Sequence, residues 1–165
     1  MQEHPLIVGW SFFAGALVFS SFVEYWVHRF MHNRRIRVHC EHHQHNAAQG
    51  VLWEYWDYVK PSFPLMFPMF LVSLPAGIGW LIGANVYALF SAFGHQLQHD
   101  NPLKCFWMPM PVHYVHHKRN QWHHNFGLAL DVWDRVFGTY KPAPDWREGL
   151  DPESAKRPIH AIRWW

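Results

Sequence analysis

The sequence predicts an all-α integral membrane bundle of about three transmembrane helices, with a histidine-rich region gathered at one end. Three observations predict this fold class. Half of the 165 residues are hydrophobic and only 16% are charged, against about 25% in an average soluble protein. The chain contains two long uncharged apolar stretches, and most of its 15 histidines lie in short clusters outside them.

The composition excludes several other classes of protein. The chain is too apolar to be a disordered segment, and two cysteines cannot form a disulfide scaffold. A formal charge of +2 gives no reason to expect a nucleic-acid partner. The mean hydropathy of -0.20 is low because histidine scores as strongly polar, and without the histidines it would be about +0.1.

The first predicted span covers residues 6–27. Residues 6–23 are uncharged, and Glu24 is the only charged residue of the span. A helix of roughly 20 apolar residues is long enough to cross a bilayer. The residues before it lack the positive charge of a signal peptide, and no small-x-small cleavage site follows.

The second apolar stretch covers residues 61–94 and contains no charged residue. As one helix it would be about 51 Å long, too long for a hydrocarbon core of roughly 30 Å. We therefore expect a hairpin of two helices near 58–75 and 78–99, with the turn at 74–79. One long kinked helix or a re-entrant loop is the alternative.

The distribution of positive charge predicts the orientation. All 14 Lys and Arg residues follow the first span and lie outside the uncharged stretch. Because positive residues favour the cytoplasmic side, we expect the N-terminus outside. Residues 28–57 and 95–142 would then share the cytoplasmic side, followed by a C-terminal tail over 143–165.

Ten histidines form four clusters with two alternating spacings. H-x-x-x-H occurs twice, and each time H-x-x-H-H follows it. Residues three or four apart share a helix face, and neutral imidazole is a good ligand for Zn, Fe, Cu or Ni. We therefore expect a site for two metal ions. Its expected ligands are His28, His32, His39, His42, His43, His95, His99, His113, His116 and His117.

Two further motifs follow the last cluster: Asn125-Phe126-Gly127, and W-D-R-V-F-G-T-Y over 133–140. Together with the four clusters, they resemble the fatty acid hydroxylase superfamily of integral-membrane di-metal enzymes, which includes the sterol desaturases. The resemblance covers roughly residues 24–142. It implies one domain over residues 1–165, in which the histidine-rich helical region caps the membrane helices.

The resemblance also implies an oxidoreductase. The expected cofactors are two iron ions, for which zinc could substitute in a structure, with O₂ as co-substrate. Such an enzyme hydroxylates or desaturates an unactivated C–H bond of a membrane-dissolved lipid, such as a fatty acyl chain, a sterol or an isoprenoid. Electrons would come from a separate ferredoxin or small haem protein with its reductase. No catalytic residue is expected beyond the metal site.

By the same resemblance, the ten histidines divide into two sets, one for each metal. The first set is His28, His32, His39, His43 and His116, and the second is His42, His95, His99, His113 and His117.

A second layer of residues is expected to orient these ligands. Metal-bound imidazoles usually donate their outer N–H to a carboxylate or carbonyl. Glu24 lies four residues before His28, and an acid inside a span is usually functional. For Asp134, an ion pair with Arg135 or a backbone cap is an equal alternative. The candidates for this layer are Glu24, His45, His123, His124, Asn125, Asp131 and Asp134. His4 and His160 are expected on the surface.

Three other functions remain open at this stage. A carotenoid ring hydroxylase is similarly short, although its first cluster tends to have four intervening residues. A non-catalytic membrane metal-binding homologue would not need the complete set of ten histidines. A hydrolytic zinc enzyme is the weakest alternative, because Glu41 is the only carboxylate inside a cluster.

Overall fold

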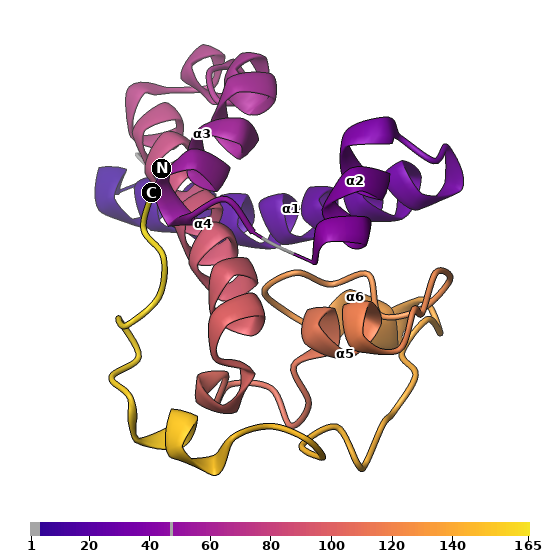
Figure 1. Ribbon diagram of the computed structural model, residues 1–165. Coiled ribbons are helices and arrows are strands. Elements are labelled where there is room, and N and C mark those ends of the chain that lie inside the picture. The colour runs from indigo at the N-terminus through magenta and orange to yellow at the C-terminus, as the bar shows by residue number, and fades with distance from the viewer. Residues whose placement is uncertain (1–3, 47) are drawn as a thin grey trace.

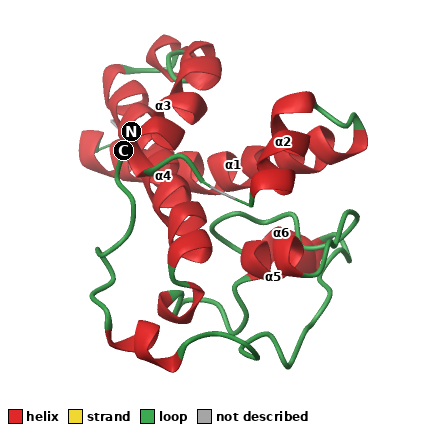
Figure 2. Cartoon of the chain, viewed as in Figure 1, coloured by secondary structure: helices red, strands yellow, loops and turns green. Residues whose placement is uncertain are grey.

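The computed structural model describes residues 4–46 and 48–165, and within these ranges it contains helices and loops but no strand (Figure 2). The prediction of an all-α fold is confirmed. Two long helices cross each other, and the shorter helices surround them (Figure 1). The helices are α1 (Pro5–Asn33), α2 (Arg37–His45), α3 (Val51–Ser62), α4 (Leu74–Asp100), α5 (Val112–Lys118) and α6 (Val132–Val136).

Glycines allow α1 and α4 to pack closely. A Cβ atom added to Gly79 would lie 2.1 Å from the carbonyl oxygen of Gly9, and one added to Gly83 would lie 2.5 Å from that of Phe13. Small residues four apart are typical of close helix contacts in membranes. Since later residues of α1 meet later residues of α4, the two helices run in the same direction. Their histidine-bearing C-terminal ends therefore lie at the same end of the crossing.

The predicted helix over 58–75 is wrong. The α3 helix ends at Ser62, and the chain continues through two single 3₁₀ turns, Phe63–Leu65 and Pro68–Leu71. Pro61, Pro64 and Pro68 account for the difference. Proline lacks the N–H that a helix needs and clashes with the preceding turn.

The predicted turn at 74–79 is also wrong, because these residues form the beginning of α4. The side chain of Ser73 caps this helix by accepting a hydrogen bond from the backbone N–H of Ala76 at 3.3 Å. Pro75 stands in the first turn, where its missing N–H costs nothing. The chain therefore reverses direction just before Leu74.

Residues 51–73, which comprise α3 and the two 3₁₀ turns, run back along α4. We call this segment the strap. The hydroxyl of Tyr55 donates to Asn85 at 2.7 Å, and the indole of Trp80 donates to the carbonyl of Leu65 at 2.9 Å. In the described part of the chain, two helices, α1 and α4, are long and apolar enough to cross a membrane. The expected third transmembrane helix is not among them.

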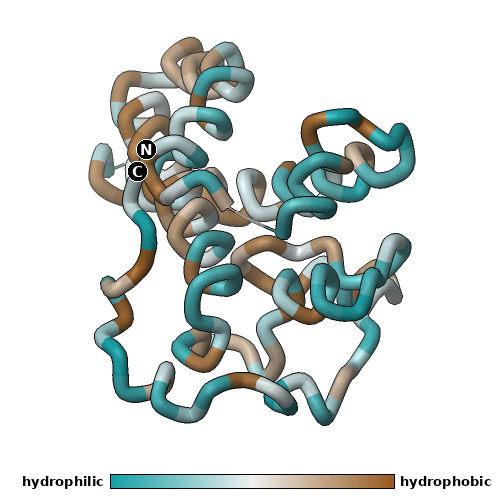
Figure 3. Tube along the Cα trace, viewed as in Figure 1, coloured by the Kyte–Doolittle hydropathy of each residue, from teal (hydrophilic) through white to brown (hydrophobic). Residues whose placement is uncertain are grey.

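The outer surface of the two long helices is strongly apolar. Leu6 and Trp10 on α1 are 67% and 68% exposed, and Leu71 before α4 is 91% exposed. Hydrophobic residues are concentrated where α1 and α4 cross and along the strap, whereas α2 is mainly hydrophilic (Figure 3). A continuous exposed apolar surface of this kind is suited to contact with lipid.

The C-terminal tail returns to the start of α3. The carbonyls of Arg163 and Trp164 accept from the backbone N–H groups of Val51 and Leu52 at 3.2 and 2.9 Å. The first N–H groups of a helix have no partner within it, so the tail supplies two of the missing acceptors.

The close approach at Gly79 can be tested with a pair of helix glycines. Gly79→Ala places a methyl group against the backbone of α1, so we expect a loss of about 1–3 kcal/mol of unfolding free energy. Gly15→Ala is the control, since its added Cβ would come no closer than 4.0 Å to Trp80. Thermal unfolding in detergent measures both. Equal midpoints for the two variants would contradict the packing described here.

Candidate metal centre

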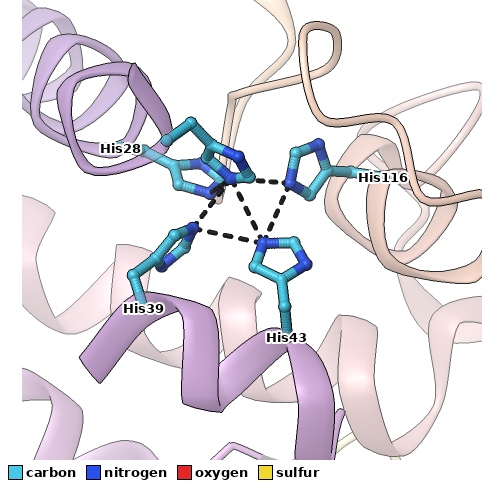
Figure 4. A group of neighbouring side chains, drawn as sticks. His28, His39, His43 and His116 are labelled. Carbon is cyan, nitrogen blue, oxygen red and sulfur yellow. Dashed lines mark hydrogen bonds between the residues drawn. The ribbon is translucent and has the colours of Figure 1, made fainter. Parts of the chain in front are cut away.

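Four helices bring the histidine clusters together. His28 and His32 lie near the end of α1, and His95 and His99 near the end of α4. The short helices α2 and α5 each carry one H-x-x-H-H cluster. Figure 4 shows His39 and His43 of α2 pointing toward His28 of α1 and His116 of α5.

The first group of imidazoles surrounds His32. Its Nε2 atom lies 3.2 Å from Nε2 of His28, 2.8 Å from that of His39, 3.2 Å from that of His43 and 2.9 Å from that of His116. All five ligand atoms lie within 4.8 Å of one another. These are the five histidines of the first expected set.

The second group is His42, His99, His113 and His117, with ligand atoms again within 4.8 Å of one another. The fifth member of this expected set, His95, stands beside it, with its Nε2 atom 3.2 Å from Nε2 of His99. The structure therefore gathers nine of the ten histidines into two groups that follow the expected division, and His95 lies beside the second group. Their role as metal ligands stays a prediction.

The spacing of the nitrogens fits a metal ion better than hydrogen bonding. One imidazole nitrogen makes a single hydrogen bond in the plane of its ring, yet Nε2 of His32 has four nitrogen neighbours within 3.2 Å. Metal–nitrogen bonds are about 2.1 Å long, so adjacent ligands of one metal stand about 3.0 Å apart. The observed separations match that value.

Burial keeps these imidazoles neutral, which is the form that binds metal. Burial, followed by the neighbouring histidines, lowers the pKa of His43 to about 3 and that of His39 to about 4. Burial likewise lowers the pKa of His116 to about 4. At neutral pH these three side chains therefore offer a lone pair and carry no charge.

His117 provides a second indication that a ligand belongs here. Within the described residues, neither of its ring nitrogens has a hydrogen-bond partner, although both are buried. Buried polar atoms are nearly always paired. A metal ion in the second group would give His117 the missing partner.

Outer hydrogen bonds turn several Nε2 atoms inward. Nδ1–H of His28 donates to the carbonyl of Phe126 at 2.5 Å, and that of His116 donates to the carbonyl of His124 at 2.7 Å. His95 donates in the same way to the carboxylate of Glu54. This is the arrangement expected around a metal. Glu54 was not among the predicted residues, since nothing in the sequence separates it from neighbouring Asp57.

The two signature motifs form one structural unit. The buried carboxylate of Asp134 accepts from the backbone N–H groups of Phe126 and Gly127, both at 2.8 Å, and from the hydroxyl of Thr139 at 2.7 Å. Burial raises the pKa of Asp134. Asp134 thereby fixes the loop whose carbonyl orients His28. Of the two alternatives, the backbone cap is observed, and Arg135 does not pair with Asp134.

Glu24 joins three parts of the centre. Its carboxylate accepts from Ser91 at 2.5 Å and Tyr87 at 2.9 Å, both on α4, and from the backbone N–H of Leu128 at 2.9 Å. In the described structure these contacts link α1, α4 and the loop after Phe126. Glu24 thus supports the elements that carry the ligands, through its hydrogen bonds to α4 and to the loop.

The other candidates for the second layer differ in their positions. Asn125 is buried, adopts a positive φ of 59°, and accepts from the backbone N–H of Lys141 at 2.9 Å. Asp131 pairs with Arg135 at 2.7 Å. The side chains of His45 and His123 are exposed, as are those of His4 and His160. His124 contributes its backbone carbonyl to the centre.

Trp122, which was not among the candidate site residues, lies against the first group of imidazoles. Its ring centroid is 4.4 Å from that of His32 and 5.3 Å from that of His43. Cys40 and Cys105 are free thiols.

A groove of about 750 Å³ leads to the histidines. One helix face of α1 and one of α4 form its apolar walls, and the strap closes a third side. His28, His42, His95 and His113 lie at one end, and Phe19 and Trp80 line it farther along the two helices.

Removing the carboxylate of Asp134 should loosen the loop that orients His28. Asp134→Ala leaves two backbone N–H groups and one hydroxyl without an acceptor, so we expect a loss of at least about 3 kcal/mol of unfolding free energy. Asp131→Ala removes an exposed ion pair nearby and should cost under about 1 kcal/mol. Chemical denaturation in detergent compares the two variants, and equal losses would be inconsistent with this role.

Comparisons with known proteins show similarity to enzymes that are named for the oxidation of lipids. Alkylglycerol monooxygenase of Danio rerio is 28% identical over an alignment of 132 positions, which covers 73% of this chain and 28% of that protein. Fatty acid 2-hydroxylase of Mus musculus is 28% identical over an alignment of 164 positions, which covers 86% of this chain and 43% of that protein. The chain thus spans less than half the length of these relatives. No solved structure matches it. The profile of the fatty acid hydroxylase family matches residues 13–139, and the chain belongs to this family.

Proposed function

We propose that this chain is an O₂-dependent, di-iron lipid hydroxylase embedded in a membrane. The observation that carries the proposal is the pair of histidine groups at the end of an apolar groove. Membership of the fatty acid hydroxylase family supports it. The ten predicted histidines would bind the two ions, five to each.

The donor set fits iron and permits zinc to replace it. Both groups consist of imidazoles alone among the described residues, and imidazole suits either metal. Bound iron would supply the redox chemistry by which O₂ oxidises an unactivated C–H bond, and zinc has none. The protein's own task is to hold neutral Nε2 atoms in place, through Phe126, His124 and Glu54, and to present the substrate.

The groove is suited to an alkyl chain. Val23 and Val27 of α1 face Ala84 and Ala88 of α4 along its walls. Apolar walls favour a hydrocarbon over water, so a bound chain would exclude water from the path to the histidines. A carbon atom of the chain could then lie beside the metal groups, where His28, His42, His95 and His113 line the groove.

The relatives favour hydroxylation over desaturation. Both are named for adding oxygen to a lipid, an alkylglycerol in one case and a fatty acid in the other. We propose the same reaction class here, with electrons from a separate ferredoxin or small haem protein. We also propose that the N-terminus lies outside and the histidines in the cytoplasm, because the positive residues follow the first span.

Metal analysis and turnover test the proposed function together. Purified protein loaded with Fe²⁺ should hold two ions per chain and, with O₂ and a reductase system, insert one atom of ¹⁸O₂ into a membrane lipid. His42→Ala should retain about one ion and form no product, because His42 belongs to the second group alone. Failure of the wild-type protein to bind metal or consume O₂ with any lipid would favour a non-catalytic homologue.

Filling the groove should block the substrate without removing the metals. We expect Ala88→Phe to lower product formation at least about tenfold, since its ring would occupy the path of the chain. The control is Leu89→Phe, whose side chain is 44% exposed on another face of α4. Metal content should match wild type in both. If Ala88→Phe leaves turnover of every lipid unchanged, this groove does not hold the substrate.

A further inference from the structure

The two histidine groups contain no negatively charged side chain. Every side chain in them is an imidazole, so two divalent ions would bring four positive charges with no anionic ligand among these residues. A bound cation is often the largest local charge of a site. Charges buried in a medium of low polarity need nearby opposite charges, so the next layer of side chains becomes important.

Glu54 is a carboxylate of that layer that contacts one of the ten histidines directly. It is 3% exposed and accepts the outer N–H of His95. The hydroxyl of Tyr58 donates to it at 3.5 Å, and the backbone N–H of Gln49 at 3.4 Å. Its hydrogen bond to an imidazole of the centre gives it the shortest path to the metals.

Asp134 and Glu24 lie one step farther out. Asp134 is fully buried and binds the N–H of Phe126, whose carbonyl accepts from His28. Glu24 is partly buried and lines the groove together with His28. Among the described residues, it accepts hydrogen bonds from two hydroxyl groups and two backbone N–H groups, all of them uncharged.

These three carboxylates differ from the acids on the surface. Within the described ranges, Glu24 and Asp134 form no ion pair, and Glu54 pairs with a histidine instead of a Lys or Arg. Many surface acids, by contrast, have a basic partner. Those pairs are Glu41 with Arg37, Asp57 with Lys60, Asp131 with Arg135, Asp145 with Arg119, and Glu153 with Lys156.

We propose that Glu24, Glu54 and Asp134 form an outer anionic shell that offsets the charge of the two metal ions. This inference rests on the proposed metal centre and adds a role for residues outside its ligand set. The carboxylates are positioning residues and charge partners, since none of them belongs to either group of ligands. Within the described residues, Glu24 and Asp134 form no ion pair and Glu54 pairs only with the imidazole of His95, so bound metal would supply the positive charge opposite all three.

Glu54→Gln separates charge from hydrogen bonding, because the amide oxygen of Gln can still accept from His95. With Zn²⁺ as a redox-inert probe, we expect the dissociation constant of the weaker-bound ion to rise at least about tenfold. The unfolding midpoint of the metal-free protein should change little, since Gln can still accept from His95. The midpoint of the zinc-loaded protein should fall.

Glu24→Gln is the second variant, and the measured quantity is the difference between zinc-loaded and metal-free midpoints. That difference should become smaller in both variants. A loss of stability that Gln causes equally in the zinc-loaded and metal-free forms cancels in the difference. Asp131→Asn is the matched control, because it removes one carboxylate that Arg135 already neutralises. Its difference should equal that of wild type.

Two outcomes separate the failure of this inference from failure of the proposed function. If wild-type protein binds two zinc ions, but Glu54→Gln and Glu24→Gln keep affinities within twofold and lose stability equally in both forms, the carboxylates serve only as hydrogen-bond acceptors. If wild-type protein binds no zinc, the metal centre itself is refuted, and the anionic shell with it.

Discussion

The crowding of neutral imidazole nitrogens is the interaction on which the rest of the structure depends. Five Nε2 atoms come within 4.8 Å of one another at the first group, where their lone pairs repel unless a cation lies between them. Burial favours this state, since it lowers the affinity of the rings for protons. The long helices supply two clusters and the short helices the other two, so the centre requires all four elements to hold their positions.

The surrounding polypeptide can be understood as the framework that maintains this crowding. Glycines bring the backbones of α1 and α4 into contact, which sets the separation of His28 from His95. The loop after His124 then closes the centre, because its carbonyls accept from His116 and His28. Asp134 and Glu24 hold that loop from two sides, so the W-D-R-V-F-G-T-Y motif acts on the centre at a distance.

Much of this arrangement could be predicted from the sequence, and the exceptions have physical reasons. Repeated i, i+4 spacing places imidazoles on one helix face, so the ten candidate ligands could be identified from the sequence. The helix predicted over 58–75 is absent, because hydropathy takes no account of Pro61, Pro64 and Pro68, which prevent a continuous helix there. Glu54 was missed because its contact with His95 joins residues 41 positions apart, and local spacing carries no information about such pairs.

X-ray absorption at the metal edge is the measurement that tests the central claim most directly. For the metal-loaded protein, we expect two ions, each with a first shell of four to five nitrogen or oxygen atoms at about 2.1 Å and no sulfur. Cys40 stands between His39 and His42 in the sequence and provides the clearest alternative ligand. A sulfur shell at about 2.3 Å, or a single ion per chain, would contradict the all-imidazole pair.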